Sequence, residues 1–283
     1  MTILVTGATG HVGRRVAERL IEAGERVRVL TRNPEGADLP DGAEICGGDL
    51  SSPATLEGPL DGVRRVYLFP VPETAEEVAG VLEKAGVEHV ALLSSMSITE
   101  DGENNPSAQH HLTVEKALRE RQFTWTFVRP TGFATNTLWR WGDAVRAEGV
   151  VRAPYGRSAR ALIHESDIGD VAAEALLGDE CAGKVLDLTG PELLTQIEQV
   201  RLIGEAIGRE IRFEEVTPEQ AREAMAGSVA PEFADMVLGA LARQVDDPGP
   251  VLPTVEEVTG RPARTFAQWA RDHADDFLGR DTR

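Results

Sequence analysis

Short apolar runs alternate with amphipathic stretches through the first half of the 283-residue chain. A continuous apolar run of strand length predicts a buried strand, whereas apolar positions that recur every three or four residues predict a helix. The expected strands are Thr2–Thr6, Arg26–Thr31, Ala43–Cys46, Arg65–Phe69, His89–Leu93 and Thr124–Val128. The expected helices are Glu73–Ala85, Ser107–Arg121, one that carries Val12, Val16 and Leu20 and ends at Gly24, and one that begins at Ser51 or Ser52. This alternation, with short connections, predicts an α/β fold: a doubly wound parallel sheet with helices on both faces.

The pattern changes after Pro130. Residues 131–160 carry aromatic residues and glycines without clear periodicity, and the chain from Pro191 onward is mostly helical in pattern. Between these stretches the sequence predicts a helix that Asp167 caps and that runs to about Leu177, and a strand at Val185–Thr189. We therefore expect one domain of residues 1–130, to whose sheet residues 161–190 return, and a smaller, mostly helical lobe of residues 131–160 and 191–283. By analogy with other proteins of this class, the lobe shapes a substrate pocket at the carboxyl edge of the sheet.

A glycine-rich turn, Gly7-Ala8-Thr9-Gly10-His11-Val12-Gly13, joins the first strand to the first helix. In a Rossmann-type βα unit, the first glycine allows the tight turn, the second lets the backbone approach a pyrophosphate, and the third lets the helix pack close to the strand. The free N–H groups and the positive dipole end of the helix favour a bound phosphate. Although glycines in such a turn can be structural only, strand, glycine turn and helix together predict a dinucleotide site. Its predicted contacts are Gly7, Thr9, Gly10, His11, Val12 and Gly13.

The end of the second strand bears on which dinucleotide binds. An acidic residue there holds the ribose hydroxyls of NAD, whereas an arginine accommodates the 2′-phosphate of NADP. This strand ends in Thr31-Arg32-Asn33, with no carboxylate before Glu35. A contact from Arg32 to a phosphate would be charge-assisted, so the sequence favours NADP(H) over NAD(H). The alternative is that Arg32 is a solvated surface residue.

Other residues that follow strands are expected at the same edge of the sheet. Asp49 and Leu50 lie where an adenine ring would lie, so Asp49 is predicted to accept a hydrogen bond from the exocyclic amine and Leu50 to cover the ring. A carboxylate that only shapes a turn is the other interpretation of Asp49. Phe69, which ends the fourth strand, and Ser94, which follows the fifth, are also predicted cofactor contacts.

Composition narrows the class of protein. The net charge of −18 argues against direct binding to nucleic acid, which needs clustered Lys and Arg. The two cysteines, Cys46 and Cys181, have no metal-ligand spacing and indicate a reduced, cytoplasmic protein without a metal site. The apolar run at the N-terminus spans only five residues, too few for a signal peptide, and no apolar stretch approaches a membrane span.

Several motifs together resemble the NmrA-like branch of the atypical short-chain dehydrogenase/reductases, including its quinone oxidoreductase type. These motifs are GATGHVG, Thr31-Arg32-Asn33, Gly48-Asp49-Leu50, His111-x-x-x-Glu115-x-x-Leu118, Phe123–Pro130 with Phe133 and Asn136 after it, and Asp187–Glu192. The resemblance covers most of residues 1–210 and implies an NAD(P)H-binding fold. It is less specific for the reaction, because the family includes NADPH-dependent reductases and proteins that only sense the redox state of the nicotinamide.

The chain departs from the standard short-chain dehydrogenases, in which a Tyr-x-x-x-Lys pair moves the proton of the substrate oxygen. Position 112, four residues before Lys116, is Leu, and the tyrosines Tyr67 and Tyr155 lie outside the predicted helix. The predicted catalytic candidates are therefore Ser95, Lys116 and His111. Lys116 would also bind the nicotinamide ribose. The alternatives are a polar strand end for the serines, a surface position for Lys116, and a helix-stabilising pair of His111 with Glu115.

These observations favour an NADPH-dependent oxidoreductase that transfers a hydride to a small quinone- or carbonyl-type acceptor. A quinone needs no strong general acid, since water or a serine can supply the proton, and orientation carries most of the catalysis. The alternative is a non-catalytic NADP(H)-binding regulator that docks on a partner protein; a homo-oligomer is also open. An epimerase or dehydratase is disfavoured, because such enzymes depend on the missing Tyr-Lys pair.

Overall fold

The computed structural model describes residues 1–100, 102 and 105–280. The chain divides into two compact units, each built from separate segments. The first comprises Met1–Thr131, Glu165–Leu188 and Thr254–Arg261. The second comprises Gly132–His164, Thr189–Pro253 and Pro262–Arg283.

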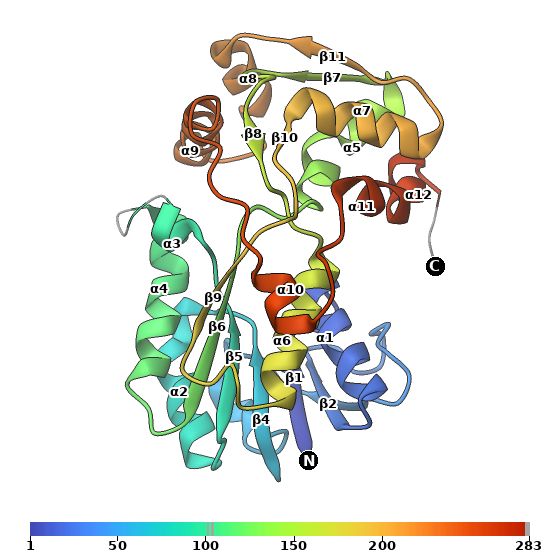
Figure 1. Ribbon diagram of the computed structural model, residues 1–283. Coiled ribbons are helices and arrows are strands. Elements are labelled where there is room, and N and C mark those ends of the chain that lie inside the picture. The colour runs from blue at the N-terminus through green and yellow to red at the C-terminus, as the bar shows by residue number, and fades with distance from the viewer. Residues whose placement is uncertain (101, 103–104, 281–283) are drawn as a thin grey trace. The chain divides into compact units, whose positions relative to one another are not determined.

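The first unit holds a seven-stranded sheet in the order β3-β2-β1-β4-β5-β6-β9, with every neighbouring pair parallel (Figure 1). The strands are β1 (Thr2–Thr6), β2 (Arg26–Thr31), β3 (Glu44–Gly47), β4 (Val63–Leu68), β5 (His89–Leu93), β6 (Thr124–Pro130) and β9 (Val185–Leu188). The order reverses at β1, the topological switch point at which doubly wound sheets bind ligands. The predicted doubly wound α/β fold is confirmed.

Helices cover both faces of this sheet. The helical segments of the unit are α1 (His11–Glu22), the 3-10 turns η1 (Pro53–Leu56) and η2 (Pro72–Thr74), α2 (Ala75–Lys84), α3 (Ser97–Glu100), α4 (Pro106–Arg119), α6 (Glu165–Leu177) and α10 (Thr254–Thr259). Side chains of α2 and α4, among them Val78 and Leu118, pack in one core cluster with Val66 and Leu92 of the sheet. Helices α1 and α6 lie together on the other face (Figure 1).

The second unit is mostly helical. Its helices are α5 (Asn136–Ala147), α7 (Gln196–Ile207), α8 (Pro218–Met225), α9 (Pro231–Arg243), α11 (Phe266–Asp272) and α12 (Ala274–Leu278). Two short sheets accompany them, formed by β7 (Val150–Ala153) with β11 (Arg212–Glu215) and by β8 (Ala159–Arg160) with β10 (Leu194–Thr195). Trp141, Ile203 and Trp269 belong to the core cluster of this unit.

Two expectations need correction. Residues Thr254–Arg261, predicted to belong to the second lobe, cluster with the first unit, because α10 packs on α6 and β9 and buries Val255 to 2% exposure. Asp167 does not precede α6 as a cap; the helix begins at Glu165 and Asp167 lies buried in its first turn. Residues 131–160, which lack sequence periodicity, contain α5, β7 and β8.

Candidate cofactor site

The glycine turn between β1 and α1 has the geometry that a phosphate-binding turn requires. Gly7 adopts a φ of +66°, which side chains rarely tolerate. A Cβ on Gly13 would lie 2.4 Å from the carbonyl oxygen of Gly7, so only glycine lets α1 approach the turn this closely. Gly10 is the N-cap of α1 and has no side chain to satisfy the first N–H groups of the helix. Those donors and the helix dipole are oriented for an anion.

A groove of about 600 Å³ lies at the carboxyl ends of the central strands, within the first unit. Its lining residues are Thr6, Gly7, Thr9, Gly10, Leu30, Thr31, Arg32, Asn33, Gly36, Ala37, Gly48, Asp49, Leu50, Ser51, Phe69 and Val71. The groove therefore brings together seven predicted cofactor residues from four separate parts of the chain. Of the other predicted contacts on α1, Val12 and Gly13 are buried beneath its first turn, and His11 is exposed.

Thr6 fixes the wall of the groove beside the glycine turn. Its hydroxyl donates to the carbonyl oxygen of Tyr67 at 3.0 Å and accepts from the backbone N–H of Phe69 at 2.7 Å. These bonds tie the end of β1 to the end of β4. Phe69 remains 46% exposed, and a Cβ on Gly7 would lie 3.2 Å from the Cβ of Phe69. The aromatic ring is thus held beside the phosphate-binding turn without being buried by the protein.

Arg32 offers an unpaired positive charge at the groove. Buried Thr31 holds the turn after β2, since its hydroxyl accepts from the N–H of Asn33 at 3.2 Å. Arg32 is exposed and has no hydrogen bond or ion pair to any residue that the structure describes. Arg14 differs, because its Nη2 donates to the carbonyl oxygen of Asp38 at 2.5 Å and to its Oδ2 at 2.8 Å. Arg14 therefore holds the loop beside the groove, while Arg32 stays available.

Asp49 has a structural role in its turn. Its Oδ1 accepts from the N–H of Ser51 at 2.9 Å, and its own N–H donates to Thr55 Oγ1 at 2.9 Å. The turn interpretation of Asp49 thus describes part of its role. Since Asp49 also lines the groove, its predicted contact with adenine stays a prediction.

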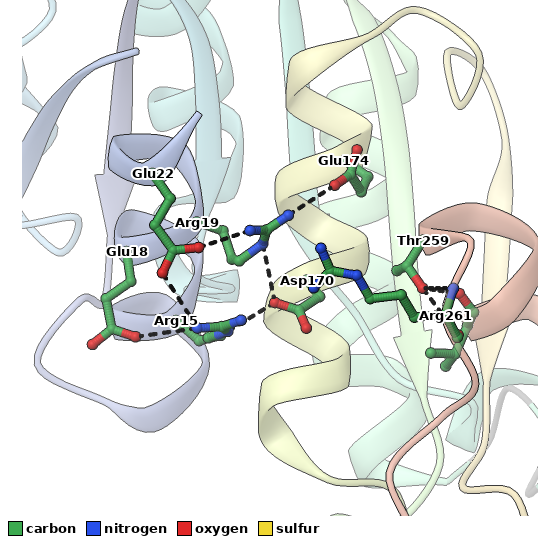
Figure 2. A network of polar contacts seen from close by, with 9 residues as sticks. Arg15, Glu18, Arg19, Glu22, Asp170, Glu174, Thr259 and Arg261 are labelled. Atoms are coloured by element: carbon green, nitrogen blue, oxygen red, sulfur yellow. Dashed lines mark hydrogen bonds and ion pairs between the residues drawn. The ribbon is translucent and has the colours of Figure 1, made fainter. Parts of the chain in front are cut away.

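Helix α6 holds the phosphate-binding helix from the side (Figure 2). Arg15 Nε donates to Asp170 Oδ1 at 2.7 Å, and Arg19 reaches Asp170 at 3.5 Å and Glu174 at 3.3 Å. A Cβ on Gly169 would lie 2.6 Å from the Cγ of Arg15, so glycine permits this close packing. Sequence reasoning missed Gly169 and Asp170, and the one signal was a glycine in mid-helix, where it normally costs stability.

Ser94 and Arg129, at the ends of β5 and β6, form a closed buried cluster with Glu115 of α4. Ser94 Oγ donates to Glu115 Oε1 at 2.7 Å. Arg129 donates to the same carboxylate through Nε at 2.7 Å and Nη2 at 2.6 Å. Glu115 is fully buried and Ser94 only 2% exposed. Ser94 and Arg129, the two partners of Glu115, are thus occupied inside the protein. Ser94 does not line the groove that contains Arg32.

The three predicted catalytic residues, Ser95, Lys116 and His111, also lie outside that groove. Ser95 is partly buried, and its Oγ accepts from the N–H of Ser97 at 3.1 Å. Lys116 is exposed on α4. His111 is partly buried, and its Nδ1 has no partner among the described residues. Burial, with a smaller effect of His110, lowers the pKa of His111 to about 4, so its imidazole is neutral at pH 7.

Neither tyrosine takes the place of the missing catalytic one. Leu112 is buried at the position on α4 where a standard enzyme carries tyrosine. Tyr67 lies in β4 with a fully buried hydroxyl, and burial raises its pKa. Tyr155 belongs to the second unit. Among the described residues no cluster of His, Cys, Asp or Glu could hold a metal ion, and no helix there is long and apolar enough to cross a membrane.

Comparison with known proteins identifies the family. A model of the NAD(P)H-binding family matches residues 7–178. The chain belongs to this family. The crystal structure of an NmrA variant shares the fold, with a TM-score of 0.73 at 17% identity.

Two relatives match nearly the whole chain. The (4-alkanoyl-5-oxo-2,5-dihydrofuran-3-yl)methyl phosphate reductase of Streptomyces griseus is 40% identical over 280 residues, which cover 97% of this chain and 99% of the relative. The NAD(P)H azoreductase of Xenophilus azovorans is 34% identical over 294 residues, which cover 97% and 99%. The crystal structure of an NADPH-dependent quinone oxidoreductase from Escherichia coli shares the fold, with a TM-score of 0.79, 23% identity and coverage of 96% and 99%. The chain of 283 residues is therefore itself an NAD(P)H-dependent oxidoreductase with a small-molecule substrate.

Proposed function

We propose that this enzyme prefers NADPH and transfers its hydride to a small, conjugated, electron-poor acceptor of the quinone or carbonyl type. The observation that carries the cofactor preference is Arg32. It lines the groove after β2 as an exposed guanidinium without a partner among the described residues. A 2′-phosphate there gains a charge-assisted contact, and no carboxylate of the strand end repels it.

The residues of the groove fit a dinucleotide. Gly7 and Gly13 leave room for the pyrophosphate at the N-terminus of α1, where side chains would fill the turn. Phe69 offers an apolar surface beside it, and Leu50 offers one at the adenine end. When bound, the reduced nicotinamide supplies the hydride. The contribution of the protein is to hold its cofactor and its acceptor in one orientation.

The acceptor class follows from the missing proton donor and from the names of the relatives. An unsaturated lactone with an alkanoyl group, an azo bond and a quinone are all conjugated acceptors. Hydride addition to such a system gives an anion that water can protonate without a strong general acid. The absence of tyrosine from α4 is compatible with this chemistry. Neutral His111, with a pKa of about 4, is not available as an imidazolium acid at pH 7.

A titration of nicotinamide fluorescence tests the cofactor preference. We expect the wild-type protein to bind NADPH more tightly than NADH. Arg32→Asp should reverse this order and weaken NADPH binding tenfold or more, because a charge-assisted bond is lost and a repulsion is added. Arg26→Asp, at an exposed position at the start of β2, is the matched control. Equal NADPH affinity in Arg32→Asp and wild type would overturn the assignment.

Absorbance at 340 nm tests the reaction. The expected result is oxidation of NADPH by 1,2-naphthoquinone and by a simple azo dye at neutral pH, with little change after His111→Gln. Tight NADPH binding without turnover of any quinone, azo or carbonyl compound would contradict the reductase and favour a redox sensor.

A further inference from the structure

The segment that follows Arg32, residues 33–38, forms part of the wall of the cofactor groove in the first unit. Three of its residues line the groove: Asn33, Gly36 and Ala37. The segment starts from a fixed point, because the N–H of Asn33 donates to Thr31 Oγ1 at 3.2 Å. Beyond that point its residues belong to no strand or helix, so regular backbone hydrogen bonds do not hold it.

One side chain ties the far end of this segment to the phosphate-binding helix. Arg14 Nη2 donates to the carbonyl oxygen of Asp38 and, at 2.8 Å, to Oδ2 of the same residue. Within the described part of the chain, these are the hydrogen bonds that join residues 35–38 to any other segment. The backbone N–H of Arg14 donates to the carbonyl oxygen of Gly10 at 2.9 Å. The tether therefore links the glycine turn to the segment beside Arg32.

Burial does not replace this tether. Glu35, Gly36 and Asp38 are exposed, and none of residues 33–38 belongs to the buried apolar core. An exposed segment without buried apolar contacts opens easily, and ordering it at the moment of binding costs conformational entropy. A segment that is already held in place avoids this cost, so the ligand binds more tightly.

We propose that Arg14 is a positioning residue for the 2′-phosphate of the cofactor: by holding Asp38 it fixes residues 33–38 beside Arg32 and so sets the preference for NADPH over NADH. This inference rests on the proposed NADPH preference. In dinucleotide-binding sheets the residues after the second strand face the 2′ position of the ribose, so a displaced segment disturbs NADPH more than NADH. Arg14 itself does not line the groove, which is why it acts through Asp38.

A double-mutant cycle of Arg14→Met and Asp38→Ala tests the inference, with the Kd of NADPH and of NADH measured by nicotinamide fluorescence. We expect Arg14→Met to raise the Kd of NADPH about three- to fivefold, the upper range for an exposed ion pair, and that of NADH less than about twofold. Asp38→Ala should also raise the Kd of NADPH, although it removes a negative charge close to a bound anion. The two effects should not add, because both substitutions break the same link.

Two further variants sharpen the cycle. Arg14→Lys keeps a cation with several donors and should recover most of the NADPH preference. Arg64→Met removes an exposed arginine that pairs with Glu88 at 2.9 Å near the start of β4, in the same unit. It is the matched control and should leave both Kd values within about twofold of wild type.

The Asp38→Ala variant separates positioning from direct binding. If Arg14 contacted the phosphate itself, Asp38→Ala would free its guanidinium and tighten NADPH binding. Arg14→Met would then cost as much in the Asp38→Ala background as in wild type. Either result would overturn the inference, and so would equal losses of NADPH and NADH affinity in Arg14→Met.

Limited proteolysis gives a readout that needs no cofactor. Glu-C protease, which cuts after glutamate, can cleave at exposed Glu35 within the segment. Since cleavage follows the population of the opened segment, we expect it to be about threefold faster in Arg14→Met and Asp38→Ala than in wild type and Arg64→Met. An unchanged rate would overturn the tether. If wild type binds NADPH and NADH equally, the proposed preference fails, and the cleavage rate alone decides whether Arg14 holds the segment.

Discussion

Two halves of one sheet edge use their polar residues differently. At the ends of β1, β2 and β4, Arg32 and Phe69 remain exposed in a groove. At the ends of β5 and β6, Ser94 and Arg129 each donate to Glu115 of α4, and all three are buried. Arg32, Phe69, Ser94 and Arg129 all lie at or directly after the ends of predicted strands, so position along the chain alone does not separate the exposed residues from the buried ones. The difference is whether the hydrogen-bonding capacity of a residue is filled inside the protein, because a residue with filled capacity has little left for a ligand.

Among the predictions, we expect the largest effect on the free energy of unfolding from a substitution in the buried cluster of Ser94, Glu115 and Arg129. Glu115→Gln keeps the size of the side chain and leaves Arg129 without its charge partner at a site where Glu115 is fully buried. Breaking a buried pair costs about 3–5 kcal/mol, so we expect a loss of that order in the free energy of unfolding. Urea denaturation followed by circular dichroism measures it. Glu120→Gln, at the exposed C-cap of the same helix, is the control, and a loss below about 1 kcal/mol would show that the cluster is not structural.

The half of the sheet edge at β1, β2 and β4, called the open half because its polar residues remain exposed, is tested at its glycine turn. Alanine normally stabilises a helix relative to glycine, but a Cβ at Gly13 would lie 2.4 Å from the carbonyl oxygen of Gly7. Gly13→Ala must therefore displace the turn, and we expect the Kd of NADPH to rise tenfold or more, about 1.4 kcal/mol. Gly80→Ala in α2 is a matched control, since its Cβ meets nothing within 4 Å. Unchanged NADPH affinity in Gly13→Ala would remove the turn from the cofactor site.

Local patterns predicted the open half well. The strands β1, β2 and β5 have the predicted bounds, because each is a short apolar run with clear stops. The groove likewise follows from residues placed directly after strands. Gly7 and Arg32 both line it, because parallel strands bring their carboxyl ends to one edge, and their contact with a cofactor stays a prediction.

The half at β5 and β6, called the closed half because its polar residues bond inside the protein, could not be predicted by the same reasoning. Its hydrogen bonds join residues that lie 14 to 21 positions apart, and nothing local shows that Glu115 turns inward from its helix. The packing of α6 on α1 joins residues 155 positions apart. In residues 131–160 the pattern failed for another reason: Trp139 of α5 is exposed while Trp141 is buried, so apolar character does not mark the buried face.

His111 gives a smaller effect with a defined pH dependence. Its pKa is about 4 in the folded protein and about 6.5 in an unfolded chain. The unfolded state then binds the proton more readily than the folded state. The contribution of neutral His111 to the free energy of unfolding is therefore fully present above pH 6.5 and is lost as the pH falls toward 4. His111→Gln should flatten this dependence by about 1–2 kcal/mol at pH 5, as measured by denaturation at pH 7 and pH 5. The exposed neighbour His110 is the control, and equal flattening in His110→Gln would contradict burial of His111 as the cause.

The smallest expected effect tests whether the side support of α1 reaches the cofactor groove. Asp170→Asn keeps the shape of the side chain and removes the charge that Arg15 and Arg19 share (Figure 2). Because both arginines are partly exposed, we expect the Kd of NADPH to rise only about two- to fivefold, as for loss of roughly 0.5–1 kcal/mol. Glu18→Gln is the control, because it removes the 3.7 Å ion pair of Arg15 with Glu18 within α1 and leaves the link to α6 intact. If Asp170→Asn lowers stability while NADPH affinity stays at the wild-type value, α6 supports the fold alone. A rise in Kd confined to Asp170→Asn instead makes it a positioning residue, since the N-terminus of α1 then depends on a partner more than 150 positions away.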